Sequence, residues 1–269
     1  MFGENMRSFT LTMQYFIGEG KKRNPLLFYL AILNFALAIF LLSLIPLGSP
    51  VASETIPWIK PIKFAFSFGL YLLTIGWILV YLKISTKMFL AISRLTALLI
   101  FMEMLVIVLQ SIQGKIYHFS IEQPLTLAIC YGMCLYLFSH LLIVANTLIT
   151  SYILYLFFQP TTLCSPAYLW GIRLGLVIFL LSCLEGGFIA FQDMYLRQGQ
   201  VLSGWGLPFA DYTSRGYLTS SHFFGLHALQ ALPVIGYTLR NRLHSQQLIF
   251  SIGIIYFTIF GYLFGKAIN

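Results

Sequence analysis

Two glutamates and one histidine lie inside long apolar stretches of the chain, where ionisable side chains are rare. They are Glu103, His140 and Glu185. An ionisable group inside a membrane span costs several kcal/mol unless it is paired or hydrated, so such a residue marks either a functional site or a contact between helices. Imidazole and carboxyl groups also exchange protons. We predict that these three residues carry the chemistry; the alternative is that each only fixes helix packing.

Other polar residues extend these positions into stripes along the expected helices. Thr96 precedes Glu103 by seven residues and Gln110 follows it by seven, so all three share one helical face. Ser182 and Gln192 flank Glu185 on another expected helix. A polar face on an apolar helix is expected to line an interior.

Three further histidines are candidate metal ligands. His118 follows the third apolar stretch, and His222 and His227 open the sixth. Imidazole binds zinc, iron, copper and haem iron. His222 and His227 are five residues apart, about 140° of rotation on a straight helix, so they need different partners or an irregular turn to share one metal. The pattern allows a metal or haem site and specifies no particular cofactor.

Basic residues at the rim of the expected helices are candidates for binding an anionic group. Lys60 and Lys63 stand beside tryptophan and proline in "PWIKPIKF", and Arg215 lies in the longest connection. Such lysines commonly anchor a span at the lipid interface. We predict that the three contact an anionic headgroup, ligand or cofactor.

The elements that must position these residues are membrane-spanning helices. The chain has 269 residues, of which 59% are hydrophobic and 9% charged. A bilayer core of about 30 Å requires about 20 helical residues, and the sequence supplies that length repeatedly. We predict an all-α, polytopic helical bundle of about seven transmembrane helices, at 25–47, 61–82, 90–112, 124–158, 168–190, 220–239 and 248–264.

Charge and turn residues predict how this bundle is organised. Residues 1–24 form an N-terminal segment, and 25–269 form a single seven-helix domain with an extracytoplasmic cap loop at about 191–219. Lys21, Lys22 and Arg23 cluster before the first span. Positive residues favour the cytoplasmic side, so we expect a multi-pass protein of the cell inner membrane, with a cytoplasmic N-terminus and an extracytoplasmic C-terminus. The net charge of +8 fits span ends and lipid headgroups, and no nucleic-acid partner is expected.

Three classes of function fit these residues. The first is an outward-facing cavity, lined by His and Glu, that binds a metal, haem or small ligand for redox or proton-linked work. The second is a proton-coupled secondary transporter, although no internal repeat stands out. The third is a noncatalytic subunit or assembly factor. Gly171 with Gly175 and Gly261 with Gly265 are expected to let helices within the chain approach closely.

Overall fold

The fold is known from a computed structural model. It describes residues 14–45, 58–117, 125–160, 163–196 and 214–268, with backbone only for 113–117, 125–134, 136, 190–196 and 214–215. Over this described part the structure is helical and contains no strand, which confirms the predicted all-α fold. The long helices are α2 (Pro25–Ser43), α3 (Ile59–Ile78), α4 (Thr86–Tyr117), α5 (Leu125–Phe158), α6 (Pro166–Leu196), α7 (Ser214–Leu239) and α8 (Ser245–Ile268), with the short 3₁₀ helix η1 (Leu79–Tyr81) after α3.

Among the residues that the structure describes, six stretches are long and apolar enough to cross a membrane, in α2, α3 with η1, α4, α5, α6 and α8. The protein is therefore a multi-pass helical membrane protein. Helix α7 falls outside this set of six, although its 26 residues would suffice in length. Several helices extend beyond the predicted apolar stretches. In particular, the expected cap loop is too long at both ends, since residues 191–196 belong to α6 and 214–219 to α7; the rest of that loop lies outside the described residues.

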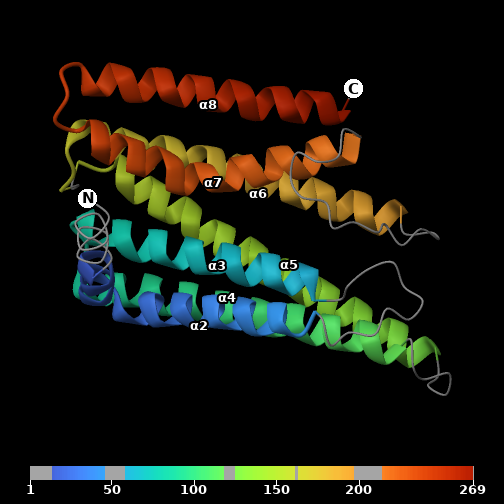
Figure 1. Ribbon diagram of the computed structural model, residues 1–269. Helices are drawn as coiled ribbons and strands as arrows, with labels where there is room; N and C mark the ends of the chain where they lie inside the picture. The colour runs from blue at the N-terminus through green and yellow to red at the C-terminus, as the bar shows by residue number, and fades with distance from the viewer. Residues whose placement is uncertain (1–13, 46–57, 118–124, 161–162, 197–213, 269) are drawn as a thin grey trace, which may run out of the picture. The chain divides into compact units, whose positions relative to one another are not determined.

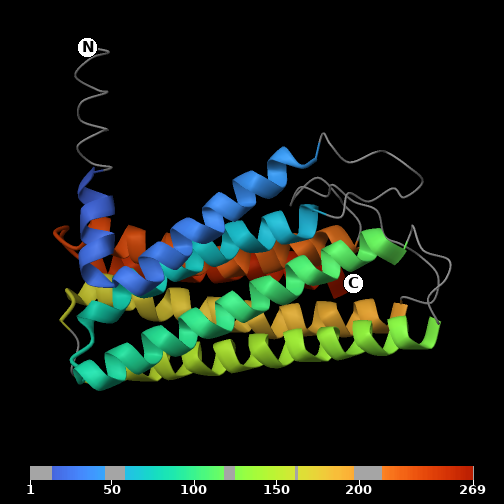
Figure 2. The ribbon, with the colours of Figure 1, turned by 90° about the horizontal axis from the view of Figure 1, so that it is seen from below.

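The chain divides into two compact units: unit 1 is Met1–Leu47 with Pro57–Ile143, and unit 2 is Gly48–Ile56 with Val144–Asn269. Helix α5 passes from the first into the second. In unit 1, α2 packs on α3 and α4, and α3 also packs on α4 (Figures 1 and 2). Their shared core contains Ala38, Ala65, Met104 and Ile107. Small side chains at the first two positions let these apolar helices pack closely.

A sharp corner joins α2 to a preceding helix that includes residues 14–23, which runs across the start of α2 in Figures 1 and 2. Asn24 forms the corner: its side-chain oxygen accepts from the Leu27 amide, and its Nδ2 donates to Ser93 Oγ at 2.7 Å. Pro25 then begins α2, a position that suits proline because the amide there has no helical partner. The corner is thus fixed to α4 and not merely a turn.

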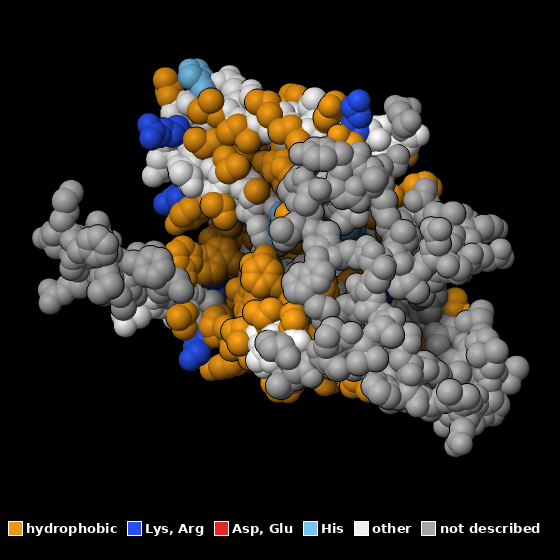
Figure 3. Space-filling view, turned by 45° about the vertical axis from the view of Figure 1, so that its right-hand side comes forward, with side chains coloured by type: hydrophobic (Ala, Val, Ile, Leu, Met, Phe, Trp, Pro, Cys, Tyr) orange, Lys and Arg blue, Asp and Glu red, His pale blue; other side chains and the backbone are white. Residues whose placement is uncertain are grey.

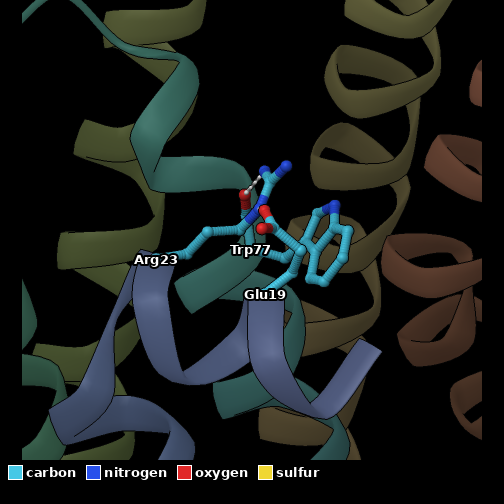
Figure 4. Close-up of polar contacts among 3 residues, drawn as sticks. All are labelled: Glu19, Arg23 and Trp77. Atoms are coloured by element: carbon cyan, nitrogen blue, oxygen red, sulfur yellow. Dashed lines mark hydrogen bonds and ion pairs between the residues drawn. The ribbon is translucent and has the colours of Figure 1, made fainter. Parts of the chain in front are cut away.

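Arg23 secures the same corner to the end of α3. Its Nη1 donates to the Trp77 carbonyl at 3.3 Å, and its guanidinium lies 4.2 Å from the centre of the Trp77 ring (Figure 4). It also pairs with Glu19 at 3.3 Å. Burial acts to lower the pKa of Arg23, but its interactions with Tyr81 and Glu19 outweigh burial and raise it. A cation here satisfies a carbonyl at a helix C-terminus, where the helix dipole also favours positive charge.

Unit 2 contains α6, α7 and α8, and each of the three packs against the other two. Their core includes Ile178, Ala228, Leu232 and Phe260. The Tyr256 hydroxyl on α8 donates to the Phe224 carbonyl on α7 at 2.7 Å. Hydrophobic side chains also cover much of the described surface on the face shown in Figure 3, as expected for helices that contact lipid.

A second arginine closes a helix end in unit 2. Both Nε and Nη2 of Arg173 donate to the Phe157 carbonyl, at 2.9 and 2.8 Å, near the C-terminus of α5. Its guanidinium lies 4.7 Å from the centre of the Phe158 ring and 4.8 Å from that of Trp170. This arrangement joins α6 to the end of α5 in the same way that Arg23 joins the N-terminal corner to the end of α3.

Candidate functional site

The helix pair α6–α7 is held by glycines that bring the two backbones into contact. A Cβ atom added at Gly171 would lie 2.5 Å from the Leu232 carbonyl oxygen, and one at Gly236 would lie 2.6 Å from the Ala167 carbonyl oxygen. At Gly175 the distance to the Ala228 carbonyl oxygen would be 2.7 Å. The close approach predicted for Gly171 and Gly175 is confirmed. The matching prediction for Gly261 and Gly265 on α8 is wrong within the described structure, because no atom lies within 4 Å of a Cβ at either.

Glu185 projects from α6 into this contact and is 6% exposed. The Ser221 hydroxyl on α7 donates to its Oε1 atom. Its Oε2 atom is buried and finds no hydrogen-bond partner among the described residues. A buried oxygen without a partner is costly, and this oxygen can accept a further hydrogen bond.

His222 follows Ser221 and is clasped by Ser182 on α6. Its Nδ1 lies 2.8 Å from the Ser182 carbonyl oxygen, and the Ser182 hydroxyl donates to the His222 carbonyl at 2.8 Å. A carbonyl can only accept, so Nδ1 carries the proton and the Nε2 of the neutral ring is an acceptor. A Cβ at Gly186 would lie 2.6 Å from the ring carbon Cε1. Glycine beside Glu185 therefore provides the space that the imidazole occupies.

The other predicted metal ligands lie apart from this clasp. His227 has its Nδ1 3.3 Å from the Gln230 Oε1, and its ring centre lies 4.3 Å from that of Phe223. The two histidines of α7 therefore have different partners, as their spacing predicts. His118 lies outside the described residues. Within the described chain no three His, Cys, Asp or Glu side chains are grouped so that they could hold a metal ion, and the three-histidine site stays a prediction.

Unit 1 holds the second buried acid, Glu103, on α4. It is 2% exposed, and the Ser139 hydroxyl on α5 donates to its Oε1 atom at 2.6 Å. Its Oε2 atom is buried without a hydrogen-bond partner in the described part of the chain. Thr96, which precedes Glu103 by seven residues on the predicted stripe, is also fully buried. His140, next to Ser139, is half-buried. Two of the three residues of the predicted polar stripe, Thr96 and Glu103, are therefore buried, while Gln110 is half-buried.

The predicted anion-binding residues are only partly described. Lys60 and Lys63 occupy the first turns of α3, and both are exposed. The Lys60 ammonium group is close enough for its charge to interact with the Glu103 carboxyl. Arg215 lies in the first turn of α7, and its side chain is outside the described set. Glu103 belongs to unit 1 and Glu185 to unit 2, so a single cavity lined by both acids stays a prediction.

Ser139, Ser221 and Gly186 were missing from the residues predicted for the site. Each serine directly precedes a predicted histidine, and the glycine directly follows a predicted glutamate. Adjacency to an ionisable residue on an apolar helix was therefore the signal available. A serine on such a helix usually bonds a carbonyl of the preceding turn. Only the folded structure shows that Ser139 and Ser221 reach a carboxyl, Ser221 while also lying 3.3 Å from the Leu218 carbonyl of its own helix.

Comparison of the chain with protein-family models, with curated proteins and with solved structures finds no match. The function is therefore inferred from the geometry of these side chains.

Proposed function

We propose that the function of this membrane protein is coupled to the binding and release of a proton, and that Glu185 is a site where this proton is bound and released. The supporting observation is its carboxyl group, almost fully buried and bonded through one oxygen to Ser221, with the other oxygen unpartnered in the described structure. An ionised carboxylate without complete hydrogen bonding is costly in apolar surroundings. Glu185 therefore carries a proton at rest and releases it when a ligand or water hydrates the site.

Proton-coupled transport of a small polar solute is the class of activity that this site fits best. A carboxyl group between two helices changes its hydration when the helices move, and such a change alters its affinity for a proton. Within this class, Ser221 fixes the carboxyl while it is neutral. The nearby imidazole of His222, with Nε2 as an acceptor, takes up or supplies the proton.

Infrared spectroscopy of the purified full chain in lipid nanodiscs tests the proton site. The wild type is expected to show a protonated-carboxyl C=O band that shifts in D2O and disappears reversibly as the pH is raised. Glu185→Gln removes its part of that band. Glu19→Gln is the matched control, because Glu19 lies on the helix before α2 and pairs with Arg23. A Glu185 band that never titrates would identify a carboxyl used only for packing and would refute the proposal.

A second candidate function, ligation of a metal or haem iron, is favoured by one observation. The Nδ1 of His222 donates to a backbone carbonyl, the usual arrangement of a histidine that ligates metal through its other nitrogen. Ser182 would then orient the ring. Metal analysis and a visible spectrum of the purified protein test this version. Stoichiometric metal or haem bands that are lost in His222→Ala would support it, and their absence from the wild type would refute it.

A further inference from the structure

The two acid–serine pairs have the same spacing along the chain. Glu103 and Ser139 are separated by 36 residues, and so are Glu185 and Ser221. In each pair the glutamate is on the earlier helix of a hairpin, α4 or α6, and the serine is on the next helix, α5 or α7. In each pair the serine hydroxyl donates to Oε1, and Oε2 is buried with no partner among the described residues. The hydrogen-bonding state of the two carboxyls is thus the same.

The residues that flank these pairs also recur. Gln110 follows Glu103 by seven residues, and Gln192 follows Glu185 by seven. His140 directly follows Ser139, just as His222 directly follows Ser221. The order Glu, Gln, Ser, His therefore occurs twice with identical spacing.

This recurrence is confined to a few polar positions. The connection between α4 and α5 is shorter than that between α6 and α7, and Gly186 corresponds to Met104. No internal repeat stands out in the sequence. The recurring element becomes visible only when the hydrogen bonds identify which serine belongs to which glutamate.

We propose that the protein contains two copies of one proton-binding site, one on α4–α5 and one on α6–α7, and that His140 serves the first as His222 serves the second. This inference rests on the function proposed for Glu185 and extends it to Glu103. Each chain would then bind two protons, one in each unit. Because each site is complete within its own hairpin, each is expected to work when the other is removed.

Labelling with dicyclohexylcarbodiimide tests the number of sites. This apolar reagent adds to protonated carboxyl groups within membranes, and peptide mass spectrometry locates and counts the adducts. The wild-type chain in nanodiscs is expected to carry two adducts, at Glu103 and Glu185. Glu103→Gln and Glu185→Gln each lose one adduct and keep the other, and the double variant loses both. Glu19→Gln, the control, keeps both.

The outcomes separate this inference from the proposed function. An adduct at Glu185 alone, unchanged by Glu103→Gln, leaves the proposed function standing and overturns the second site. Adducts at neither residue, together with an infrared band that does not titrate, refute both. Loss of both adducts in a single variant that remains folded by circular dichroism shows one shared site and also overturns the inference.

The histidines are proposed to take up or supply the proton of the adjacent carboxyl, so their test needs a readout that simple destabilisation would not change. His140→Gln is expected to shift the pH profile of adduct formation at Glu103 and to leave the profile at Glu185 unchanged. His222→Gln is expected to do the reverse. If neither His140→Gln nor His140→Ala moves the Glu103 profile, His140 has no part in the first site and the proposed equivalence is wrong.

Discussion

Unit 1 and unit 2 hold the same acid–serine pair in different kinds of packing. In unit 2 the helices α6 and α7 touch through their backbones, as at Gly171 against the Leu232 carbonyl. In unit 1 the close approach of α3 to α2 is to a side chain, since a Cβ at Gly69 would meet the ring of Phe35 at 2.6 Å. Side chains can rotate, whereas helix backbones must move as a whole. The same acid–serine pair therefore occurs in a unit whose helices touch through their backbones and in a unit whose close helix contact is to a side chain that can rotate.

The arginines show the same contrast at the helix ends. Arg173 directs two donors at one carbonyl and has aromatic rings on α5 and α6 beside it. Arg23 also lies beside two rings, those of Trp77 and Tyr81, but it makes one longer hydrogen bond to a carbonyl and shares its charge with Glu19. Charge therefore contributes more at the Arg23 corner than at Arg173. In the same unit as Arg23, the Lys60 charge interacts with Glu103.

The largest difference between the units is expected from adding one methyl group. Gly171→Ala places a carbon against a backbone carbonyl and should lower the free energy of unfolding by up to about 3 kcal/mol. Gly69→Ala displaces only the far edge of the Phe35 ring, and alanine is the better helix former, so its effect should be close to zero. Unfolding of each variant in mild detergent, monitored by circular dichroism, measures both changes in unfolding free energy. Equal losses would contradict the contrast.

A smaller difference is expected from removing the serine donors. Ser221→Ala should cost about 1 to 2 kcal/mol of unfolding free energy, because the Glu185 carboxyl loses its one described hydrogen bond at the contact between α6 and α7. Ser139→Ala should cost less, since side-chain packing in unit 1 can readjust around Glu103. The same unfolding assay applies, with Ser43→Ala as the exposed control. A greater loss for Ser139→Ala would reverse the assignment of the rigid unit.

The smallest difference is expected at the arginines. Arg173→Lys removes one of two donors and the planar contact with two rings, a loss of about 1 kcal/mol. Arg23→Lys also removes a planar contact with two rings, those of Trp77 and Tyr81, but it retains an ammonium group that can still pair with Glu19, so a smaller loss is expected. Raising the salt concentration provides the check: it should weaken the Arg23 corner measurably and leave the Arg173 contact nearly unchanged. Equal salt dependence would show that charge matters alike in both units.

Sequence reasoning predicted much of the fold because the bilayer constrains length and polarity. The break between the predicted spans 61–82 and 90–112, the burial of Glu103 and Glu185, and the tight contact at Gly171 all follow from such constraints. Helix ends were less predictable. The backbone hydrogen-bond ladder continues past the point where hydropathy falls, so α4 begins at Thr86 and α6 continues to Leu196.

The partners of the two acids could not be predicted because each acid and its serine lie on different helices, 36 residues apart, and helical periodicity does not relate residues across the connection between two helices. Each acid pairs with a serine on a neighbouring helix, and the fold determines which helices are neighbours. The sequence contained Ser139 and Ser221 beside two predicted histidines, but nothing local distinguishes a serine that bonds its own helix from one that crosses to the next.

The modest apolarity of α7 has a consequence for how the protein is made. Helices α6 and α8 can each enter the bilayer as independent segments, but α7 lacks the apolar surface to partition alone, and its serines and histidines need neighbours. We therefore expect α7 to enter the lipid phase together with α6. The residues that form the Glu185 site thus make insertion of this segment dependent on its neighbour, and a chain from which α6 is deleted would leave α7 without the helix that covers its polar side chains.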